Sequence, residues 1–180
     1  MSKVPDEYIL DLLASSATRD KGFTLLMDTY KERIYWHIRR LVVSHEDAED
    51  ILQETFINAY RYAGSFNHKS SLFTWLYKIA TNESVRLFRK QKRIKGKVQI
   101  SKDFLKEPIG HEPVNGDEML MKFQQAILSL PEKQRIVFNL RYYDELDYEE
   151  IGKILNTSTG ALKTNYHYAN ERIKEFLINN

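Results

Sequence analysis

The residues best suited to chemistry lie on one predicted helix that begins near Leu72. Polar and aromatic residues recur there at steps of three, four, four and three, which places on one helix face Trp75, Lys78, Asn82, Arg86 and Arg89. Aromatic rings stack on unpaired bases, amides hydrogen-bond base edges, and cations hold the phosphate backbone. This set, called here the single-strand face, favours binding to melted nucleic acid. The alternative is that Trp75 packs in the core and the cations only solvate the helix.

An acidic helix is predicted after Ser44. Between Ser44 and Tyr60 there are five acidic residues and no Lys or Arg. Its candidate binding residues are Asp47, Asp50, Gln53, Glu54 and Asn58. Paired carboxylates can hold a metal or perform acid–base catalysis, but the five histidines are scattered and the helix dipole explains acids in a first turn. The pattern therefore predicts no enzyme and no metal or other cofactor, and leaves open a docking face for a basic protein.

The C-terminal residues have the pattern of a helix-turn-helix. A cap at Asp147 opens a short helix, 156–159 form a turn and a second cap, and a longer helix follows with an apolar stripe from Leu162 to Phe176. The second helix of such a pair can enter a DNA major groove, although similar pairs also occur in proteins that never touch DNA. The candidate duplex-binding residues are Ser158, Thr159, Lys163, Thr164, His167, Tyr168 and Arg172.

Helices must position all these residues. Apolar residues recur at steps of three and four from Phe23 to Leu41, and again after Ser44, Leu72 and Pro131. Between residues 93 and 116 the periodicity lapses and Gly and Pro accumulate, which is typical of a linker. We therefore predict an all-α fold with two small helical domains, 1–92 and 117–180, joined by a flexible linker at 93–116.

Composition and charge narrow the class of protein further. The 180 residues include only seven Gly and four Pro, which favours helices. The sequence has no Cys, which excludes thiolate chemistry and fits a reducing compartment, so the expected location is cytoplasmic. The longest aliphatic run is the triplet 41–43, so no membrane insertion is expected.

Charged residues are grouped by sign along the chain: seven Lys or Arg fall within 86–97, and five acidic residues fall within 144–150. Such blocks suit different partners, or they are simply solvated helix faces.

Four segments resemble a known family. Residues 47–61, DAEDILQETFINAYR, and 73–82, FTWLYKIATN, closely resemble conserved region two of bacterial RNA polymerase sigma factors of the extracytoplasmic-function kind, in the sigma-70 family. Residues 130–135, LPEKQR, and 147–152, DYEEIG, resemble their region four. The segments stand in the family's order, and the resemblance covers nearly the whole chain.

This resemblance implies a promoter-specificity subunit that is not itself an enzyme. It implies that Asp47, Asp50, Gln53, Glu54 and Asn58 dock on core RNA polymerase, and that hydrophobic surface around Leu130 and Phe138 meets the polymerase flap. It implies that the loop 65–71 and the single-strand face capture melted promoter DNA at the minus-ten element, with the residues Ser65, Phe66, Asn67, Lys69, Trp75, Lys78, Asn82, Arg86 and Arg89. The helix-turn-helix would read the minus-thirty-five element, and an anti-sigma factor is a further expected partner.

One segment departs from the family pattern. Where the family's recognition helix commonly carries three arginines, this chain has Asn165, Tyr168 and Asn170. Fewer cations predict weaker phosphate anchoring, so this domain should depend on polymerase for stable DNA binding. Two alternatives are a one-component helix-turn-helix regulator that acts without polymerase, and a helical adaptor with no nucleic-acid role.

Overall fold

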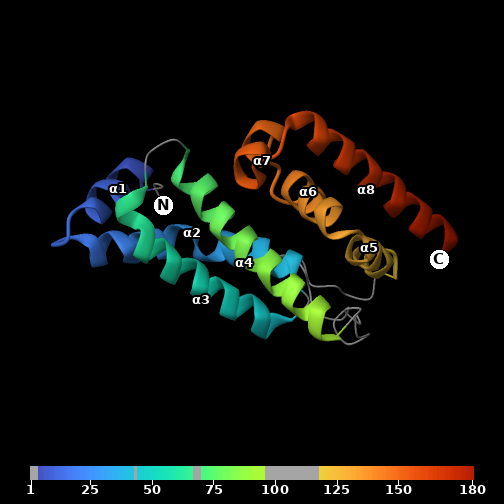
Figure 1. Ribbon diagram of the computed structural model, residues 1–180, viewed down its shortest axis with the longest axis horizontal. Coiled ribbons are helices and arrows are strands. Elements are labelled where there is room, and N and C mark those ends of the chain that lie inside the picture. Colours follow the sequence, from blue (N-terminus) through green and yellow to red (C-terminus); the bar gives the residue numbers. More distant parts are fainter. Residues whose placement is uncertain (1–3, 43, 67–69, 96–117) are drawn as a thin grey trace.

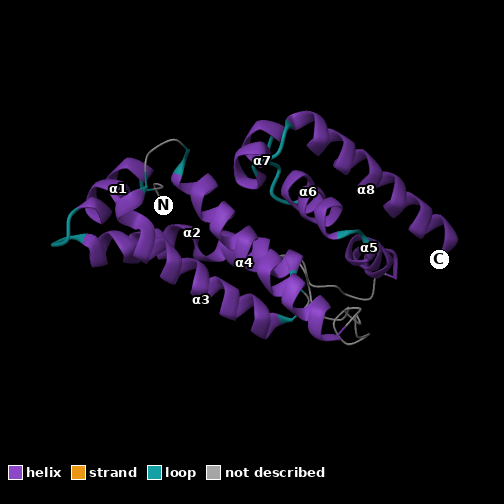
Figure 2. Ribbon diagram, in the orientation of Figure 1, coloured by secondary structure: helices purple, strands orange, loops and turns teal. Residues whose placement is uncertain are grey.

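The computed structural model describes residues 4–42, 44–66, 70–95 and 118–180, and these residues form helices and connecting turns with no strand among them (Figures 1 and 2). The predicted all-α class is confirmed. The helices are α1 (Asp6–Ala14), α2 (Arg19–Leu41), α3 (His45–Tyr62), the 3-10 turn η1 (Ala63–Ser65), α4 (Leu72–Lys95), α5 (Glu118–Ser129), α6 (Glu132–Tyr142), α7 (Tyr148–Leu155) and α8 (Thr159–Asn179). None of the helices in these ranges is both long and apolar enough to cross a bilayer.

Helices α1 to α4 pack into an N-terminal unit. The stripe predicted from Phe23 to Leu41 forms α2, and its residues Leu26, Ile34 and Ile38 are fully buried. Ser44 caps α3 as predicted, because its side chain accepts a hydrogen bond from the Asp47 backbone N–H at 3.3 Å. These local signals fix where the helices begin, and burial of their apolar stripes holds them together.

Helices α5 to α8 form a C-terminal unit. The Asp147 carboxylate accepts from the Glu150 backbone N–H at 2.8 Å, and the Glu150 carboxylate accepts in return from the Asp147 backbone N–H at 3.2 Å. This reciprocal capping box starts α7 as the sequence predicts. Asn156, with φ 50°, ends α7 in the left-handed conformation that turns the chain towards α8.

The two units lie against each other in Figure 1, with α6 against α2 and α7 against α4. One apolar cluster runs through both units: it contains Leu76 and Tyr77 of α4 together with Leu140, Ile151 and Ile154 of the C-terminal unit. A second cluster joins α5, α6 and α8. Helix α4 continues to Lys95 and so includes the first three residues of the predicted linker, and the rest of that linker lies outside the described residues.

Candidate nucleic-acid interface

The single-strand face lies along α4 as one row of mostly exposed side chains. Lys78 and Asn82 are exposed, and the side chains of Arg86 and Arg89 have relative exposures of 73% and 71%. Trp75 is half-buried and packs against the apolar cluster. Trp75 is thus partly a core residue and partly a surface residue, which combines the two alternatives that the sequence left open.

A second aromatic ring stands beside Trp75. The ring centroids of Phe66 and Trp75 are 5.3 Å apart, with an angle of 60° between the ring planes. Phe66 follows η1, and the helix carrying Trp75 starts just after Ser71, whose hydroxyl accepts from the Thr74 backbone N–H at 3.1 Å. Phe66 and Trp75 therefore come together where the loop enters α4. The other predicted loop contacts, Asn67, Lys69 and the side chain of Ser65, lie outside the described residues.

Two cations of the single-strand face have carboxylate partners. Arg86 pairs with Glu83 one helical turn away, at 2.7 Å. Glu83 also accepts from the Asn58 amide at 3.2 Å, which links α4 to the acidic helix α3. Arg89 lies 3.8 Å from Glu132 of α6. In both pairs the arginine is largely exposed, whereas the Glu83 and Glu132 side chains are 15% and 33% exposed. The exposed arginines remain accessible to phosphate.

The acidic side of α3 borders two grooves. Asp50 and Gln53 line a groove of about 460 Å³ between α2 and α3, whose floor includes Phe23, Met27 and Phe56. Asp50 and Glu54 line another of about 300 Å³ between α3 and α4. Asp47 and Asn58, by contrast, are half-buried and hydrogen-bonded within the unit. The first groove combines apolar side chains with two carboxylates and one lysine, which suits a basic, amphipathic partner surface. The second groove is mostly charged and contains Arg86 and Lys90 as well as carboxylates.

The predicted duplex-binding residues all lie on one accessible surface. The residues Ser158, Thr159, Lys163, Thr164, His167, Tyr168 and Arg172 are all exposed, on α8 or at its N-cap. The core stripe of the same helix, Leu162, Ala169 and Ile173, is buried on the opposite side. Residues 159–161 at the start of α8 are exposed, and a helix N-terminus is suited to phosphate.

The apolar surface predicted around Leu130 and Phe138 is not formed by those two side chains. Their relative exposures are 5% and 2%, because both pack into the cluster between α5, α6 and α8. Tyr142, stacked on Phe138 with ring centroids 5.1 Å apart, is 50% exposed, and Met119 is 62% exposed. The exposed apolar area on α5 and α6 therefore comes from Met119 and Tyr142 rather than from Leu130 and Phe138.

Several known proteins are similar to this chain in sequence and in fold. Residues 26–94 match the family Sigma-70 region 2, and residues 120–172 match Sigma-70, region 4. The chain is 36% identical over 166 residues to the ECF RNA polymerase sigma factor SigW of Bacillus subtilis, which covers 87% of this chain and 89% of that protein. It is 34% identical over 163 residues to the ECF RNA polymerase sigma-E factor of Escherichia coli K12, covering 85% of each.

The chain belongs to the ECF RNA polymerase sigma factors. A solved structure of the sigma factor RpoE in complex with the anti-sigma factor NepR from Bartonella quintana matches this sigma factor with a TM-score of 0.72 and 26% identity, covering 87% of this chain and 97% of that one. The resemblance first seen in the four sequence segments is thereby confirmed over both helical units.

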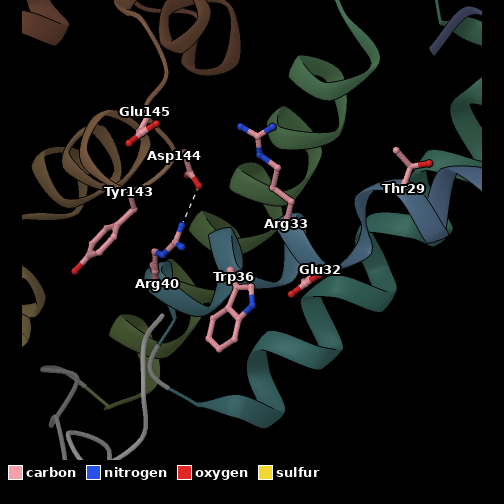
Figure 3. Close-up of a pocket in the computed structure, with 8 residues that line it drawn as sticks. All are labelled: Thr29, Glu32, Arg33, Trp36, Arg40, Tyr143, Asp144 and Glu145. Carbon is pink, nitrogen blue, oxygen red and sulfur yellow. Dashed lines mark hydrogen bonds and ion pairs between the residues drawn. The ribbon is translucent and has the colours of Figure 1, made fainter. Parts of the chain in front are cut away.

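Sequence reasoning missed the residues that join the two units of this sigma factor. Asp144, in the turn between α6 and α7, receives hydrogen bonds from α2 and α4, and the Asn139 amide donates to the Arg40 carbonyl oxygen at 3.0 Å. Figure 3 shows Arg40 joined to Asp144, at 2.9 Å, in the lining of a polar cavity of about 390 Å³ to which Tyr143 and Glu145 also contribute. No local pattern indicates such contacts, because the partners lie between 67 and 107 positions apart in the chain.

Proposed function

We propose that this sigma factor binds core RNA polymerase through the acidic side of α3 and the grooves beside it, and places its two units on different forms of promoter DNA. The N-terminal unit holds the melted strand at the minus-ten element. The C-terminal unit reads the minus-thirty-five element as duplex. The observation that carries this proposal is the presence, on one chain, of a half-buried tryptophan beside a row of exposed cations on α4 and of exposed candidate duplex-binding side chains on α8.

The chemistry of each surface supports this assignment. A half-buried Trp75 beside Phe66 offers ring faces to an unstacked base, and the exposed Lys78 and Arg86 hold the phosphates on either side. The α8 surface instead offers short hydroxyl side chains, one lysine and a helix N-terminus, which suit the edges and backbone of an intact groove.

The proposal also covers partners and location. The RpoE structure that matches this chain contains the anti-sigma factor NepR. We infer that an anti-sigma factor likewise binds this chain and covers its polymerase-docking surface, and that the protein acts in the cytoplasm. Family membership favours this reading over a one-component regulator that works without polymerase.

Run-off transcription with purified core polymerase tests the proposed function. We expect specific transcripts from promoters selected by the reconstituted holoenzyme. We expect the charge reversals Asp50→Lys and Glu54→Lys to reduce binding to core polymerase at least tenfold, because they oppose a basic partner surface. Asp11→Lys on α1, an equally exposed acid, is the matched control.

Failure of the wild-type protein to bind core polymerase, while folded and without an inhibitor, would remove the proposal. Equal losses in Asp50→Lys and Asp11→Lys would remove the assignment of the docking face.

A further inference from the structure

One aromatic ring of the C-terminal unit lies beside two cations that come from different helices. Tyr148 is the first residue of α7 and is half-buried. The guanidinium carbon of Arg141, on α6, lies 5.5 Å from the centroid of the Tyr148 ring, and Nζ of Lys163, on α8, lies 5.8 Å from it. Both distances fall within the range of about 6 Å in which an aromatic face attracts a cation. The Tyr148 ring therefore links α6 and α8 through α7.

The Tyr148 ring is itself held in place by its neighbours. It packs against the apolar cluster that contains Ile151 and Ile154 of the same helix. Its centroid lies 6.3 Å from that of the Tyr166 ring of α8, with an angle of 75° between the ring planes. Tyr166 in turn stacks on the buried Phe138, with ring centroids 5.8 Å apart. The position of the Tyr148 ring is therefore set by core packing.

The two cations beside the ring differ in how they are held. The Arg141 guanidinium also donates to the Leu146 carbonyl oxygen at 3.0 Å, so a hydrogen bond fixes it across the turn between α6 and α7. Lys163 is exposed on α8, and its ammonium stands at the end of a flexible stem. The Tyr148 ring is therefore an ordered element against which a mobile side chain can settle.

Lys163 has a particular place among the candidate duplex-binding residues. Lys163 and Arg172 are the two residues of that set with a permanent positive charge, and nine positions separate them, or about 14 Å along the helix at about 1.5 Å per residue. The polar residues that follow Lys163 are held by α8 itself, because the Thr164 hydroxyl and the Asn165 amide donate to backbone carbonyl oxygens one turn back, at 3.0 Å and 2.8 Å. Lys163 is instead oriented by a residue of the neighbouring helix.

We propose that Tyr148 is a positioning residue for recognition of the minus-thirty-five duplex: its ring holds the Lys163 ammonium in the orientation in which this cation enters the groove. The inference rests on the proposed function and deepens it, because it states how α7 prepares α8 for DNA. A side chain that is already ordered loses less freedom on binding, so Lys163 contacts a phosphate or a guanine edge at a lower entropic cost. Tyr148 itself needs no contact with DNA.

Nuclear magnetic resonance of the free, full-length protein tests the contact itself. Protons above the face of an aromatic ring are shifted upfield, so we expect the methylene protons next to Nζ of Lys163 to lie upfield of those of Lys153, an exposed lysine of α7. Tyr148→Leu should bring the Lys163 signals back to those of Lys153. Lys163 signals that are unshifted in the wild type overturn the proposal.

Variants of the ring separate positioning from packing. Tyr148→Phe keeps the π face, and we expect its holoenzyme to bind minus-thirty-five DNA within about twofold of wild type. Tyr148→trifluorophenylalanine keeps a ring of similar shape but attracts cations less, and we expect a loss of affinity of about two- to fivefold. Thermal unfolding verifies that both variants are folded. Equal affinities of the two variants overturn the proposal, because packing or the hydroxyl would then explain any loss.

A double-mutant cycle identifies the cation that Tyr148 positions. Lys163→Met removes the charge and keeps a long side chain, so in this background the fluorinated ring should bind DNA as well as the unfluorinated ring. Lys153→Met is the matched control, because Lys153 lies about 140° around α7 from Tyr148 at about 100° per residue. The effect of fluorination should persist in that control. An equal effect of fluorination in both backgrounds overturns the proposal, since Lys163 would then not be the positioned group.

Cognate and scrambled minus-thirty-five sequences separate this proposal from the proposed function. We expect the fluorinated ring to weaken binding of the holoenzyme mainly to the cognate sequence. A wild-type holoenzyme that binds both sequences equally refutes the proposed function, and the positioning role falls with it, although the Lys163 signals still report the ring contact. A wild type that prefers the cognate sequence, together with a fluorinated variant of unchanged affinity, refutes the positioning role alone.

Discussion

Phe66 and Trp75 form a tilted aromatic pair, with ring centroids 5.3 Å apart, where the loop after α3 meets the start of α4. Neither ring lies in the fully buried core. A pair of half-exposed rings next to a row of cations is the local structure that an unstacked base requires.

Removing the Phe66 ring should impair the melting of promoter DNA more than the folding of the protein. We expect Phe66→Ala to reduce stable opening of promoter DNA by about 5- to 100-fold, since base–aromatic stacking contributes roughly 1–3 kcal/mol. Permanganate reactivity of unpaired thymines in the minus-ten region measures this. Binding to core polymerase serves as the internal control and should be unchanged. A loss of polymerase binding equal to the loss of melting would show a folding defect instead.

Adding a cation to the recognition helix should strengthen duplex binding. Tyr168 is 54% exposed on α8 and occupies a position where the family commonly has arginine. We expect Tyr168→Arg to raise affinity of the holoenzyme for minus-thirty-five DNA and to steepen its salt dependence by about one unit, as one added phosphate contact predicts.

Ile178→Arg is the control for this substitution. It adds the same charge to the same helix at a position that is 82% exposed but near the C-terminus, away from the duplex-binding residues. Equal gains from both variants would mean that net charge, rather than placement in the groove, controls affinity.

Gly22 allows a close approach of two helices. A Cβ at this position would lie 2.9 Å from both the Leu12 Cβ and the Leu13 backbone N of α1. We therefore expect Gly22→Ala to destabilise the protein by about 1–3 kcal/mol despite the better helix propensity of alanine. Gly160→Ala in α8, where a Cβ meets nothing within 4 Å, should be neutral or slightly stabilising. Thermal unfolding of the two variants provides the comparison, and a Tm for Gly22→Ala at or above wild type would contradict it.

The capping box of α7 should contribute measurably to stability. Asp147→Ala leaves the Glu150 backbone N–H without its side-chain acceptor, and we expect a loss of about 1 kcal/mol in the free energy of unfolding. Asp147→Asn keeps an acceptor oxygen and should recover most of this loss. Denaturant titration measures both, and equal destabilisation by Ala and Asn would assign the effect to charge rather than to capping.

Local features of the fold could be predicted from the sequence because they depend on neighbouring residues. Ser44, Asp147 and Ser158 each cap the helix whose start they predict, through a bond to a backbone N–H three positions on. The exposed face of α8 also follows directly from its apolar stripe. Helical periodicity and capping are short-range, so one sequence suffices to find them.

The contact between the units could not be predicted in this way. His37 and Asp144 are 107 positions apart, and nothing in the residues around either indicates the other. Leu130 and Phe138 show a related difficulty. The sequence indicates an apolar surface around them, but periodicity does not distinguish an apolar residue buried in its own domain from one exposed for binding another protein. Packing of α5 and α8 over them decides that question.

The apolar cluster that continues from α4 into α6 and α7 has a consequence for how the protein melts. Two helical units that share buried side chains cannot lose their cores independently, so heating the free protein should produce one calorimetric transition with coincident loss of helix and of near-ultraviolet signal. Leu140 and Ile151 lie in that shared cluster, so the two halves of the chain stabilise each other, and two separate transitions would contradict this coupling.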